Sequence, residues 1–230
     1  MSNESCISFL QVFDSLLTTR YSRLTTMKII CIGRNYSEHI RELNSEVPEE
    51  PVVFMKPDSA LLRNNDPFYI PEFSQDLHYE CELIIRIKRL GSHIETRFAN
   101  RYYDEIGLGI DFTARDLQNK LKDRGLPWEK SKAFDRSAVI SNDFILKTEL
   151  PDINSIRFEL KKNGLTVQRG DSAKMLYSVD ELISHISSYF TLKIGDLIYT
   201  GTPSGVGPVA IGDRLEGFLE GKKMFDFIIK

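Results

Sequence analysis

The 230-residue sequence has few cysteines, no excess of basic charge and no long apolar run. Its three cysteines, Cys6, Cys31 and Cys81, are odd in number and widely spaced, which excludes a disulfide framework and a CxxC zinc site and favours a reducing cytosol. Thirty basic and thirty-three acidic side chains give a net charge of −3, so no nucleic-acid partner is expected. No run approaches the ~20 apolar residues of a membrane span. We therefore expect a compact cytoplasmic protein with no membrane segment.

The length fits one globular domain with a short appendage. The appendage is residues 1–26, where apolar side chains recur at the spacing of a short amphipathic helix: Phe9, Leu10, Phe13, Leu16 and Leu17. A secretory signal would need a basic head and a continuous apolar stretch, and Glu4 and Asp14 argue against a transit peptide. A buried-strand pattern follows directly after Met27. We divide the chain into an N-terminal extension without assigned function, residues 1–26, and a functional domain, residues 27–230.

The functional domain is rich in predicted strands and turns and has few predicted helices. Apolar runs and alternation predict strands over 28–32, 52–55, 77–88, 106–110, 192–200, 214–219 and 224–229. Residues 155–169 are typical of a hairpin with its tight turn at Asn163-Gly164. Helical patterns cover 36–43, 113–122 and 179–189. Because strands and helices do not alternate regularly, the pattern favours a β-rich α+β fold over a parallel doubly wound sheet.

Two glutamates in the predicted strand over 77–88 are candidate metal ligands. Glu80 and Glu82 lie two residues apart and so project from the same face, while Leu83 and Ile85 project from the other face into the core. Adjacent carboxylates repel each other unless a positive charge lies between them. A divalent cation is the simplest solution, and ligands that are all oxygen favour Mg²⁺ or Mn²⁺. The alternative is a solvated strand whose glutamates face bulk water.

A third carboxylate strengthens the metal hypothesis. Asp111 ends an apolar strand whose glycines allow close approach of the backbone. Arg115 and Gln118 follow three residues apart and therefore share one face of the helix predicted over 113–122, where they form a candidate anion-binding wall. The alternative for Arg115 is an ion pair with a neighbouring acid such as Asp116.

Five short motifs occur in a fixed order along the chain: GRNYSEH at 33–39, FMKP at 54–57, HYECE at 78–82, DFTARDLQ at 111–118 and TGTPSGVG at 200–207. Together they resemble the fumarylacetoacetate hydrolase family, in its short, single-domain branch. That branch contains acylpyruvases, oxaloacetate decarboxylases or tautomerases, and hydroxyheptadienedioate isomerases. The resemblance runs from Met27 to nearly the C-terminus. It implies a mixed, β-roll-like fold and, usually, a homodimer.

The resemblance also implies a role for each candidate site residue. Three carboxylates would hold Mg²⁺ or Mn²⁺: Glu80, Glu82 and Asp111. His39 and Glu42 would form a general-base pair on a mobile lid helix. Lys132 would stabilise a developing oxyanion or deliver a proton, with Lys130 as the competing lysine. The substrate would be bound by Arg34, Tyr36, Lys56, Arg115, Gln118 and Thr202.

These groups suit the chemistry of a small 2-oxo acid, which is the expected partner. Its carboxylate and keto oxygens can chelate one cation, and the cation stabilises the enolate that appears when the C3–C4 bond breaks. Water activated by His39 would give hydrolysis, whereas loss of CO₂ or movement of a proton reaches the same enolate. We therefore expect a metal-dependent C–C bond hydrolase or lyase that hydrolyses acylpyruvates and/or decarboxylates or tautomerises oxaloacetate. The alternatives are 2-hydroxyhepta-2,4-diene-1,7-dioate isomerisation or decarboxylation, and a non-catalytic relative that binds a metal or an oxo acid.

Overall fold

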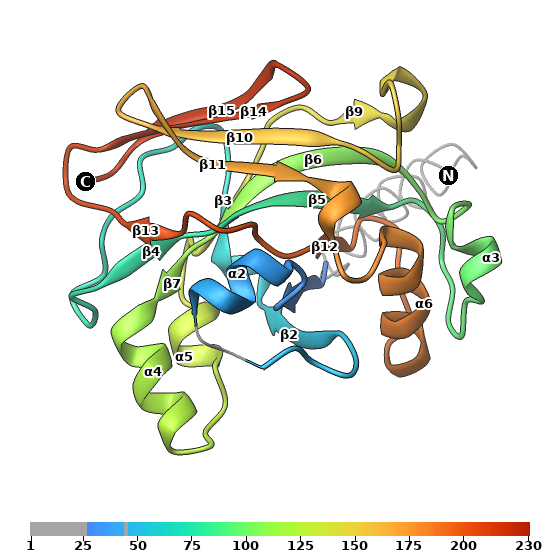
Figure 1. Cartoon of the computed structure of the whole chain (residues 1–230), viewed down its shortest axis with the longest axis horizontal. Helices are drawn as coiled ribbons and strands as arrows, with labels where there is room; N and C mark the ends of the chain where they lie inside the picture. The colour runs from blue at the N-terminus through green and yellow to red at the C-terminus, as the bar shows by residue number, and fades with distance from the viewer. Residues whose placement is uncertain (1–26, 44–45) are drawn as a thin grey trace, which may run out of the picture.

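A curled sheet forms the centre of the molecule (Figure 1), and its strands run in the order β2–β1–β12–β5–β6–β8–β3, with β9 also pairing with β6. The computed structural model describes residues 27–43 and 46–230, so the amphipathic helix predicted within residues 1–26 lies outside the described residues. The strands of the curled sheet are β1 (Ile29–Gly33), β2 (Val52–Lys56), β3 (Leu61–Leu62), β5 (Cys81–Ile87), β6 (Tyr103–Asp111), β8 (Ala138–Ile140), β9 (Ile145–Leu146) and β12 (Leu197–Tyr199).

Two smaller sheets and several short helices complete the fold. One sheet has the order β11 (Leu165–Asp171), β10 (Arg157–Lys162), β14 (Arg214–Leu219), β15 (Lys222–Ile228); the other has β13 (Gly207–Pro208), β4 (Leu77–Tyr79), β7 (Thr113–Ala114). The α-helices are α2 (Ser37–Glu42), α3 (Thr96–Ala99), α4 (Arg115–Asp123), α5 (Glu129–Lys132) and α6 (Val179–Tyr189). Single 3₁₀ turns cover Asp58–Ala60, Lys147–Glu149 and Ser172–Lys174. This β-rich α+β architecture confirms the predicted fold class.

The hydrophobic core lies between the curled sheet and the sheet formed by β10, β11, β14 and β15. One face of β5 and β6 supplies Cys81, Leu83, Ile85, Ile106, Leu108 and Ile110, and the facing sheet supplies Phe158, Leu160, Leu215, Phe225 and Phe227. Figure 1 shows α2, α4 and α5 on the other side of β5 and β6. Because side chains alternate along a strand, that side receives the intervening residues of β5 and β6, including Glu82 and Asp111. The core thus fixes which residues face the helices.

Local sequence signals placed several elements correctly. The hairpin of β10 and β11 turns at Asn163-Gly164, and φ is positive at both residues, 54° and 80°, as a two-residue turn of this kind requires. Helix α6 spans the predicted residues, and Ser178 and Glu181 close its N-terminus with a capping box.

Three predicted boundaries are wrong, and pairing with the third sheet explains two of them. The single strand expected over 77–88 is interrupted at Glu80, because β4 pairs with β7 and β13 whereas β5 belongs to the curled sheet. The helix expected from Thr113 begins at Arg115, because Thr113 pairs with His78 as part of β7. The third is the strand expected over 192–200, of which only β12, Leu197–Tyr199, forms, because residues 193–196 make a turn in which the backbone N–H of Asp196 donates to the carbonyl oxygen of Lys193 over 3.1 Å.

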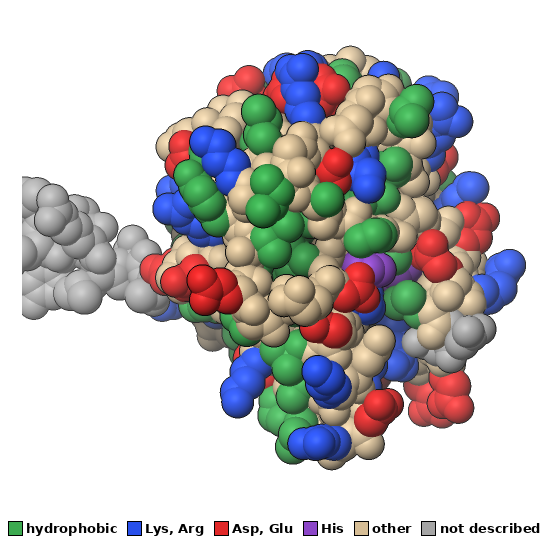
Figure 2. Space-filling view, turned by 90° about the vertical axis from the view of Figure 1, so that its left-hand side faces the viewer, with side chains coloured by type: hydrophobic (Ala, Val, Ile, Leu, Met, Phe, Trp, Pro, Cys, Tyr) green, Lys and Arg blue, Asp and Glu red, His purple; other side chains and the backbone are tan. Residues whose placement is uncertain are grey.

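The surface and the helices are consistent with the composition. On the face shown in Figure 2, acidic and basic side chains are interspersed, and apolar side chains are scattered between them. Within the described part of the chain, no helix is both long enough and apolar enough to cross a membrane. The absence of a nucleic-acid partner stays a prediction.

Candidate active site

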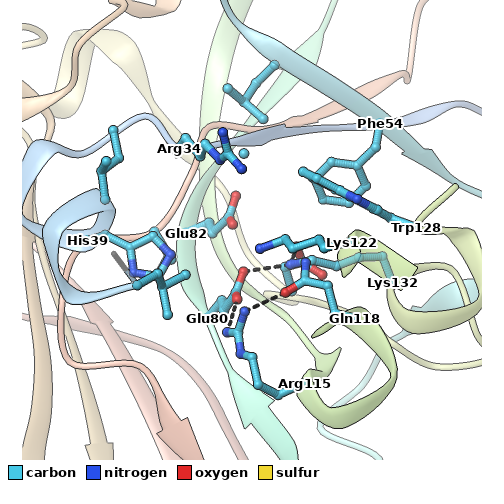
Figure 3. Close-up of a pocket in the computed structure, with 16 residues that line it drawn as sticks. Arg34, His39, Phe54, Glu80, Glu82, Arg115, Gln118, Lys122, Trp128 and Lys132 are labelled. Carbon is cyan, nitrogen blue, oxygen red and sulfur yellow. Dashed lines mark hydrogen bonds and ion pairs between the residues drawn. The ribbon is translucent and has the colours of Figure 1, made fainter. Parts of the chain in front are cut away.

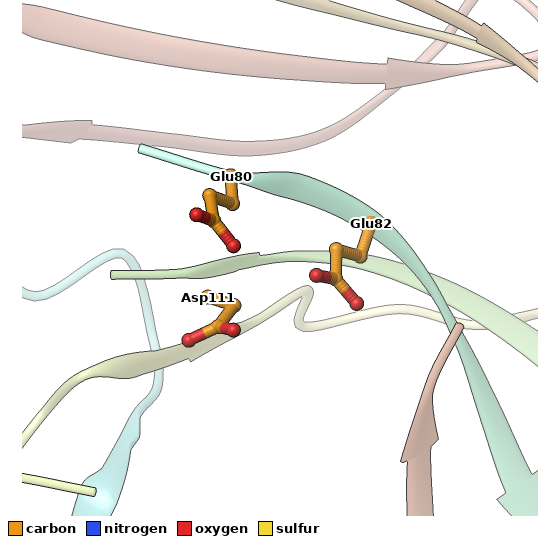
Figure 4. Close-up of side chains that lie close together, drawn as sticks. All are labelled: Glu80, Glu82 and Asp111. Atoms are coloured by element: carbon orange, nitrogen blue, oxygen red, sulfur yellow. The ribbon is translucent and has the colours of Figure 1, made fainter. Parts of the chain in front are cut away.

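The register of two neighbouring strands brings three carboxylates together. Glu82 lies opposite Gly109 in the antiparallel pair of β5 and β6, and the backbone N–H of Asp111 donates to the carbonyl oxygen of Glu80 over 2.8 Å. All three side chains therefore leave the same face of the sheet. One ligand oxygen from each of Glu80, Glu82 and Asp111 lies within 4.8 Å of the other two (Figure 4). The side chains are buried, with 5%, 2% and 0% of their residue surface exposed.

Glycine in β6 is needed for this arrangement. A Cβ atom at Gly109 would lie 2.0 Å from the carbonyl oxygen of Val139 in β8 and 2.5 Å from the Cδ1 atom of Ile84. Only a residue without a side chain lets β8 approach β6 this closely. The close packing of β8 against β6 therefore explains why a glycine is found at position 109, two residues before Asp111.

Cationic side chains contact two of the three carboxylates. The Lys132 ammonium lies 2.7 Å from Oε2 of Glu80 and 2.6 Å from Oδ2 of Asp111. Arg115 donates to Oε1 of Glu80, and the Lys56 ammonium lies 2.6 Å from Oδ1 of Asp111. These contacts balance much of the charge that burial would otherwise make costly.

Glu82 is the carboxylate without such compensation. Its Oε2 accepts a 2.7 Å hydrogen bond from the backbone N–H of Gly201, and among the described residues no cationic side chain forms an ion pair with it. Burial raises the pKa of Glu82 well above its usual range, and repulsion from Asp111 and Glu80 adds to the rise. A positive charge placed among the three oxygens would relieve this repulsion.

The neighbouring Glu80 and Lys132, unlike Glu82, are both stabilised in their charged forms. Burial would raise the pKa of Glu80, but the Lys132 ammonium and the Arg115 guanidinium outweigh it and hold that pKa well below its usual range. Burial disfavours the charge on Lys132, yet Asp111 and Glu80 raise the pKa of this lysine to about 12. Both groups are therefore charged at neutral pH. Three buried oxygen donors of this kind fit a divalent cation such as Mg²⁺ or Mn²⁺.

His39 and Glu42, the two residues predicted to act together as a general base, both lie on helix α2. His39 lies at the wall of the pocket, and its Nδ1 is 3.0 Å from Oε2 of Glu42. The other carboxylate oxygen of Glu42 accepts a 3.0 Å hydrogen bond from the backbone N–H of Gly205. Glu42 thereby connects α2 to the loop between β12 and β13, residues 200–206. The other ring nitrogen of His39, Nε2, does not contact Glu42. Figure 3 shows the ring of His39 beside Glu80 and Glu82.

The other predicted residues occupy different positions around the same pocket. Pocket-lining residues among them are Arg34, His39, Glu80, Glu82, Asp111, Arg115, Gln118, Lys132 and Thr202. Lys56 lies behind Asp111, where its ammonium also contacts Ser137 at 3.0 Å. Tyr36 is buried, and within the described residues its hydroxyl has no hydrogen-bond partner. Of the two competing lysines, Lys132 reaches the carboxylates and Lys130 is exposed.

Two residues of the site were not predicted from the sequence. Lys122, in the last turn of α4, lines the pocket, although a lysine there has the spacing of an ordinary surface charge. Gln168, in β11, accepts a 2.9 Å hydrogen bond from the backbone N–H of Cys81 and donates to the Thr202 hydroxyl over 2.9 Å. It therefore fixes Thr202 against the strand that carries the glutamates. No local pattern reveals either role, because both depend on contacts between distant segments.

Comparison with known proteins agrees with this geometry. The family described as Fumarylacetoacetate (FAA) hydrolase C-terminal matches residues 28–225. A mitochondrial oxaloacetate tautomerase, FAHD1, of Mus musculus is 39% identical over 202 residues, which cover 88% of this chain and 91% of the relative. A mitochondrial oxaloacetate decarboxylase of Dictyostelium discoideum is 41% identical over 210 residues, which cover 90% of this chain and 96% of the relative.

Solved structures give the same result. The fumarylpyruvate hydrolase of Pseudomonas aeruginosa, in complex with Mn²⁺ and pyruvate, superposes with a TM-score of 0.82 at 33% sequence identity. The match covers 88% of this chain and 88% of that chain. The sequence motifs, the fold and the buried acidic site thus agree with both kinds of relative, and the protein belongs to the fumarylacetoacetate hydrolase family of enzymes.

Proposed function

We propose that the protein is a divalent-metal-dependent enzyme that tautomerises or decarboxylates oxaloacetate. The observation that carries the proposal is the convergence of three buried carboxylates, Glu80, Glu82 and Asp111, at one wall of a pocket that also contains several cationic side chains. The names of the mouse and Dictyostelium relatives support oxaloacetate as the substrate. The Mn²⁺ and pyruvate in the Pseudomonas structure support a metal and a 2-oxo acid at a site of this kind.

A divalent cation at these carboxylates would act as a Lewis acid and polarise the keto group of a 2-oxo acid. Arg115 and Gln118, joined by a 2.7 Å hydrogen bond, form a polar wall that would orient the substrate. The Thr202 hydroxyl would also orient the substrate, from the loop after β12. Hydrogen bonds with Gln168 and with the carbonyl oxygen of Cys81 hold this hydroxyl in place.

Proton transfer is assigned to His39, and stabilisation of the developing negative charge to Lys132. Tautomerisation moves one proton between carbon and oxygen, and decarboxylation returns one proton to carbon after CO₂ leaves. Histidine readily accepts and returns a proton near neutral pH, and Nε2 of His39 is available once Nδ1 contacts Glu42. Lys132 is charged and would stabilise negative charge that develops on the substrate oxygen.

A second activity, acylpyruvate hydrolysis, is favoured by the His39–Glu42 pair. Hydrolysis needs a base that takes a proton from water, and Glu42 would stabilise the imidazolium ion that results. Carbon–carbon bond cleavage would then leave a pyruvate enolate to be protonated. Lys132 would again face the developing charge.

Three further statements stay proposals. We propose that the enzyme is a homodimer, as is usual in the family, and light scattering at micromolar concentration tests this. We also propose that residues 27–230 are sufficient for the chemistry, which turnover by protein lacking residues 1–26 tests. Finally, we propose a cytoplasmic location, as cysteine usage predicts, whereas the mouse and Dictyostelium relatives are named as mitochondrial. Fractionation of the source cells separates these two locations.

The function is tested by turnover with controlled metal content. Protein stripped with EDTA and then given Mg²⁺ or Mn²⁺ should convert the enol form of oxaloacetate to the keto form, followed by its ultraviolet absorbance, or release pyruvate, followed by a coupled assay. Activity should vanish with EDTA and return with metal. Asp111→Asn should stay inactive at the metal concentration that restores the unmodified protein. Turnover that is indifferent to EDTA and to Asp111→Asn would refute the proposal.

A further inference from the structure

Two cationic side chains in the pocket have no carboxylate partner. Arg34 follows β1, and Lys122 lies in the last turn of α4. Within residues 27–43 and 46–230 neither forms an ion pair, whereas Arg115 and Lys132 both contact Glu80. Figure 3 shows the side chains of Arg34 and Lys122 in the pocket near Glu80 and Glu82. Part of the pocket's positive charge is therefore left for a ligand.

The backbone at Arg34 is held in a conformation that few residues adopt. Its φ is 60°, in the left-handed region, which side chains other than glycine enter at a cost. The next residue, Asn35, fixes this turn, because its side-chain amide donates to the carbonyl oxygens of Tyr177 and Thr200 over 3.1 and 2.8 Å. Its side-chain oxygen accepts from the backbone N–H of Tyr177 over 2.9 Å. These contacts hold Arg34 at the pocket rather than on a free loop.

Lys122 is held in the pocket by different forces. It is half-buried, and its ammonium lies 5.4 Å from the ring centre of Trp128, close enough for a cation–π interaction. Burial, followed by the positive charges of Arg115 and Arg34, lowers the pKa of Lys122 to about 8. A cation in such surroundings is destabilised by its neighbours, and an anionic ligand would remove that cost.

We propose that Lys122, together with Arg34, binds the distal carboxylate of a dicarboxylic 2-oxo acid. This inference rests on the proposed function, because the 2-oxo end of the substrate must face Glu80, Glu82 and Asp111. Because Arg34 and Lys122 line the same pocket, they would be within reach of the other end of a short substrate. Oxaloacetate has a carboxylate at that end, and acetylpyruvate has an uncharged acetyl group. The pair of cations is therefore the determinant that selects dicarboxylic 2-oxo acids over acylpyruvates with an uncharged acyl group, such as acetylpyruvate.

The experiment compares Lys122→Met with two matched variants. Lys120→Met removes the same charge from an exposed position of the same helix, and Lys122→Arg keeps a cation in the pocket. The kcat/KM is measured with Mn²⁺ for oxaloacetate and for acetylpyruvate. Lys122→Met should lower the value for oxaloacetate about 10- to 100-fold, as expected for loss of a hydrogen bond to a charged group. The value for acetylpyruvate should change much less, Lys122→Arg should restore most of the loss, and Lys120→Met should resemble the unmodified protein.

A binding measurement removes the dependence on turnover. Trp128 is the single tryptophan of the chain and lies in the pocket, so its fluorescence reports occupancy directly. Oxalate resembles the 2-oxo end of the substrate and lacks a distal carboxylate. With Mn²⁺ present, Lys122→Met should weaken binding of malate, which carries the second carboxylate but has no keto group to react, about 10- to 100-fold and leave binding of oxalate nearly unchanged.

The outcomes separate the two proposals. Equal losses in kcat/KM for oxaloacetate and acetylpyruvate, or in affinity for malate and oxalate, would mean that Lys122 acts on every anion in the pocket, and the distal-carboxylate site would be refuted. Unmodified protein that turns over neither substrate with any metal would refute the proposed function instead. In that case, the fluorescence titrations still decide whether Lys122 recognises the second carboxylate.

Discussion

Replacing Glu42 by glutamine tests whether the carboxylate acts through His39. The carboxylate accepts from Gly205 and contacts Nδ1 of His39, both at 3.0 Å, and glutamine can keep this shape while losing the charge. A hydrogen bond to a charged group contributes about 1.5–3 kcal/mol, so kcat for acetylpyruvate hydrolysis should fall about 10- to 100-fold. His39→Ala removes the base itself and should lower kcat about 10²- to 10⁴-fold.

The assay is release of pyruvate from acetylpyruvate with saturating Mn²⁺. We expect KM to change little in Glu42→Gln, because Glu42 acts on the base and not on the bound substrate. The double variant His39→Ala/Glu42→Gln should be no slower than His39→Ala alone. Glu38→Gln, an exposed change on the same helix, is the control and should retain full activity. Losses that multiply in the double variant would refute the pairing of Glu42 with His39.

Three other variants test the site and the sheet that carries it. Mn²⁺ at 100-fold excess over its Kd should stabilise the unmodified protein by about 2.7 kcal/mol and so raise its Tm. Glu82→Gln should fold but lose this rise, which calorimetry measures. Lys132→Met leaves two buried carboxylates without their shared cation, so the free energy of unfolding in urea should fall by about 3–5 kcal/mol without metal and by less with Mn²⁺. Gly109→Ala places a Cβ 2.0 Å from a backbone oxygen of β8, and an unchanged Tm would contradict that close approach.

The acidic part of the site could be predicted because its signals are local. Strand alternation places Glu80 and Glu82 on one face, and Leu83 and Ile85 identify the opposite face as the core side. The interruption at Glu80 did not spoil the prediction, since the two glutamates still point the same way. Asp111 at the end of a glycine-bearing strand was a weaker signal, and only the antiparallel register of β5 and β6 brings it beside Glu80.

The rest of the site depends on contacts that no sequence pattern encodes. The position of Lys122 in its helix predicts a side chain that faces solvent. Only the packing of α4 beside α5 places its ammonium over the ring of Trp128. Gln168 lies in a hairpin strand and reaches the site because that hairpin lies against the start of β5. The division of 77–88 into two strands likewise follows from the third sheet, whose partners are distant in sequence. Tertiary pairing overrides local pattern at each of these positions.

The most direct test of the account is to locate Mn²⁺ by anomalous diffraction in crystals grown with Mn²⁺ and oxalate. We predict one strong anomalous peak among the carboxylates of Glu80, Glu82 and Asp111, with metal–oxygen distances of about 2.0–2.4 Å. Oxalate should occupy open positions of the same ion, on the side that faces the pocket. An ion bound by other residues, or a site left empty at millimolar Mn²⁺, would contradict the account.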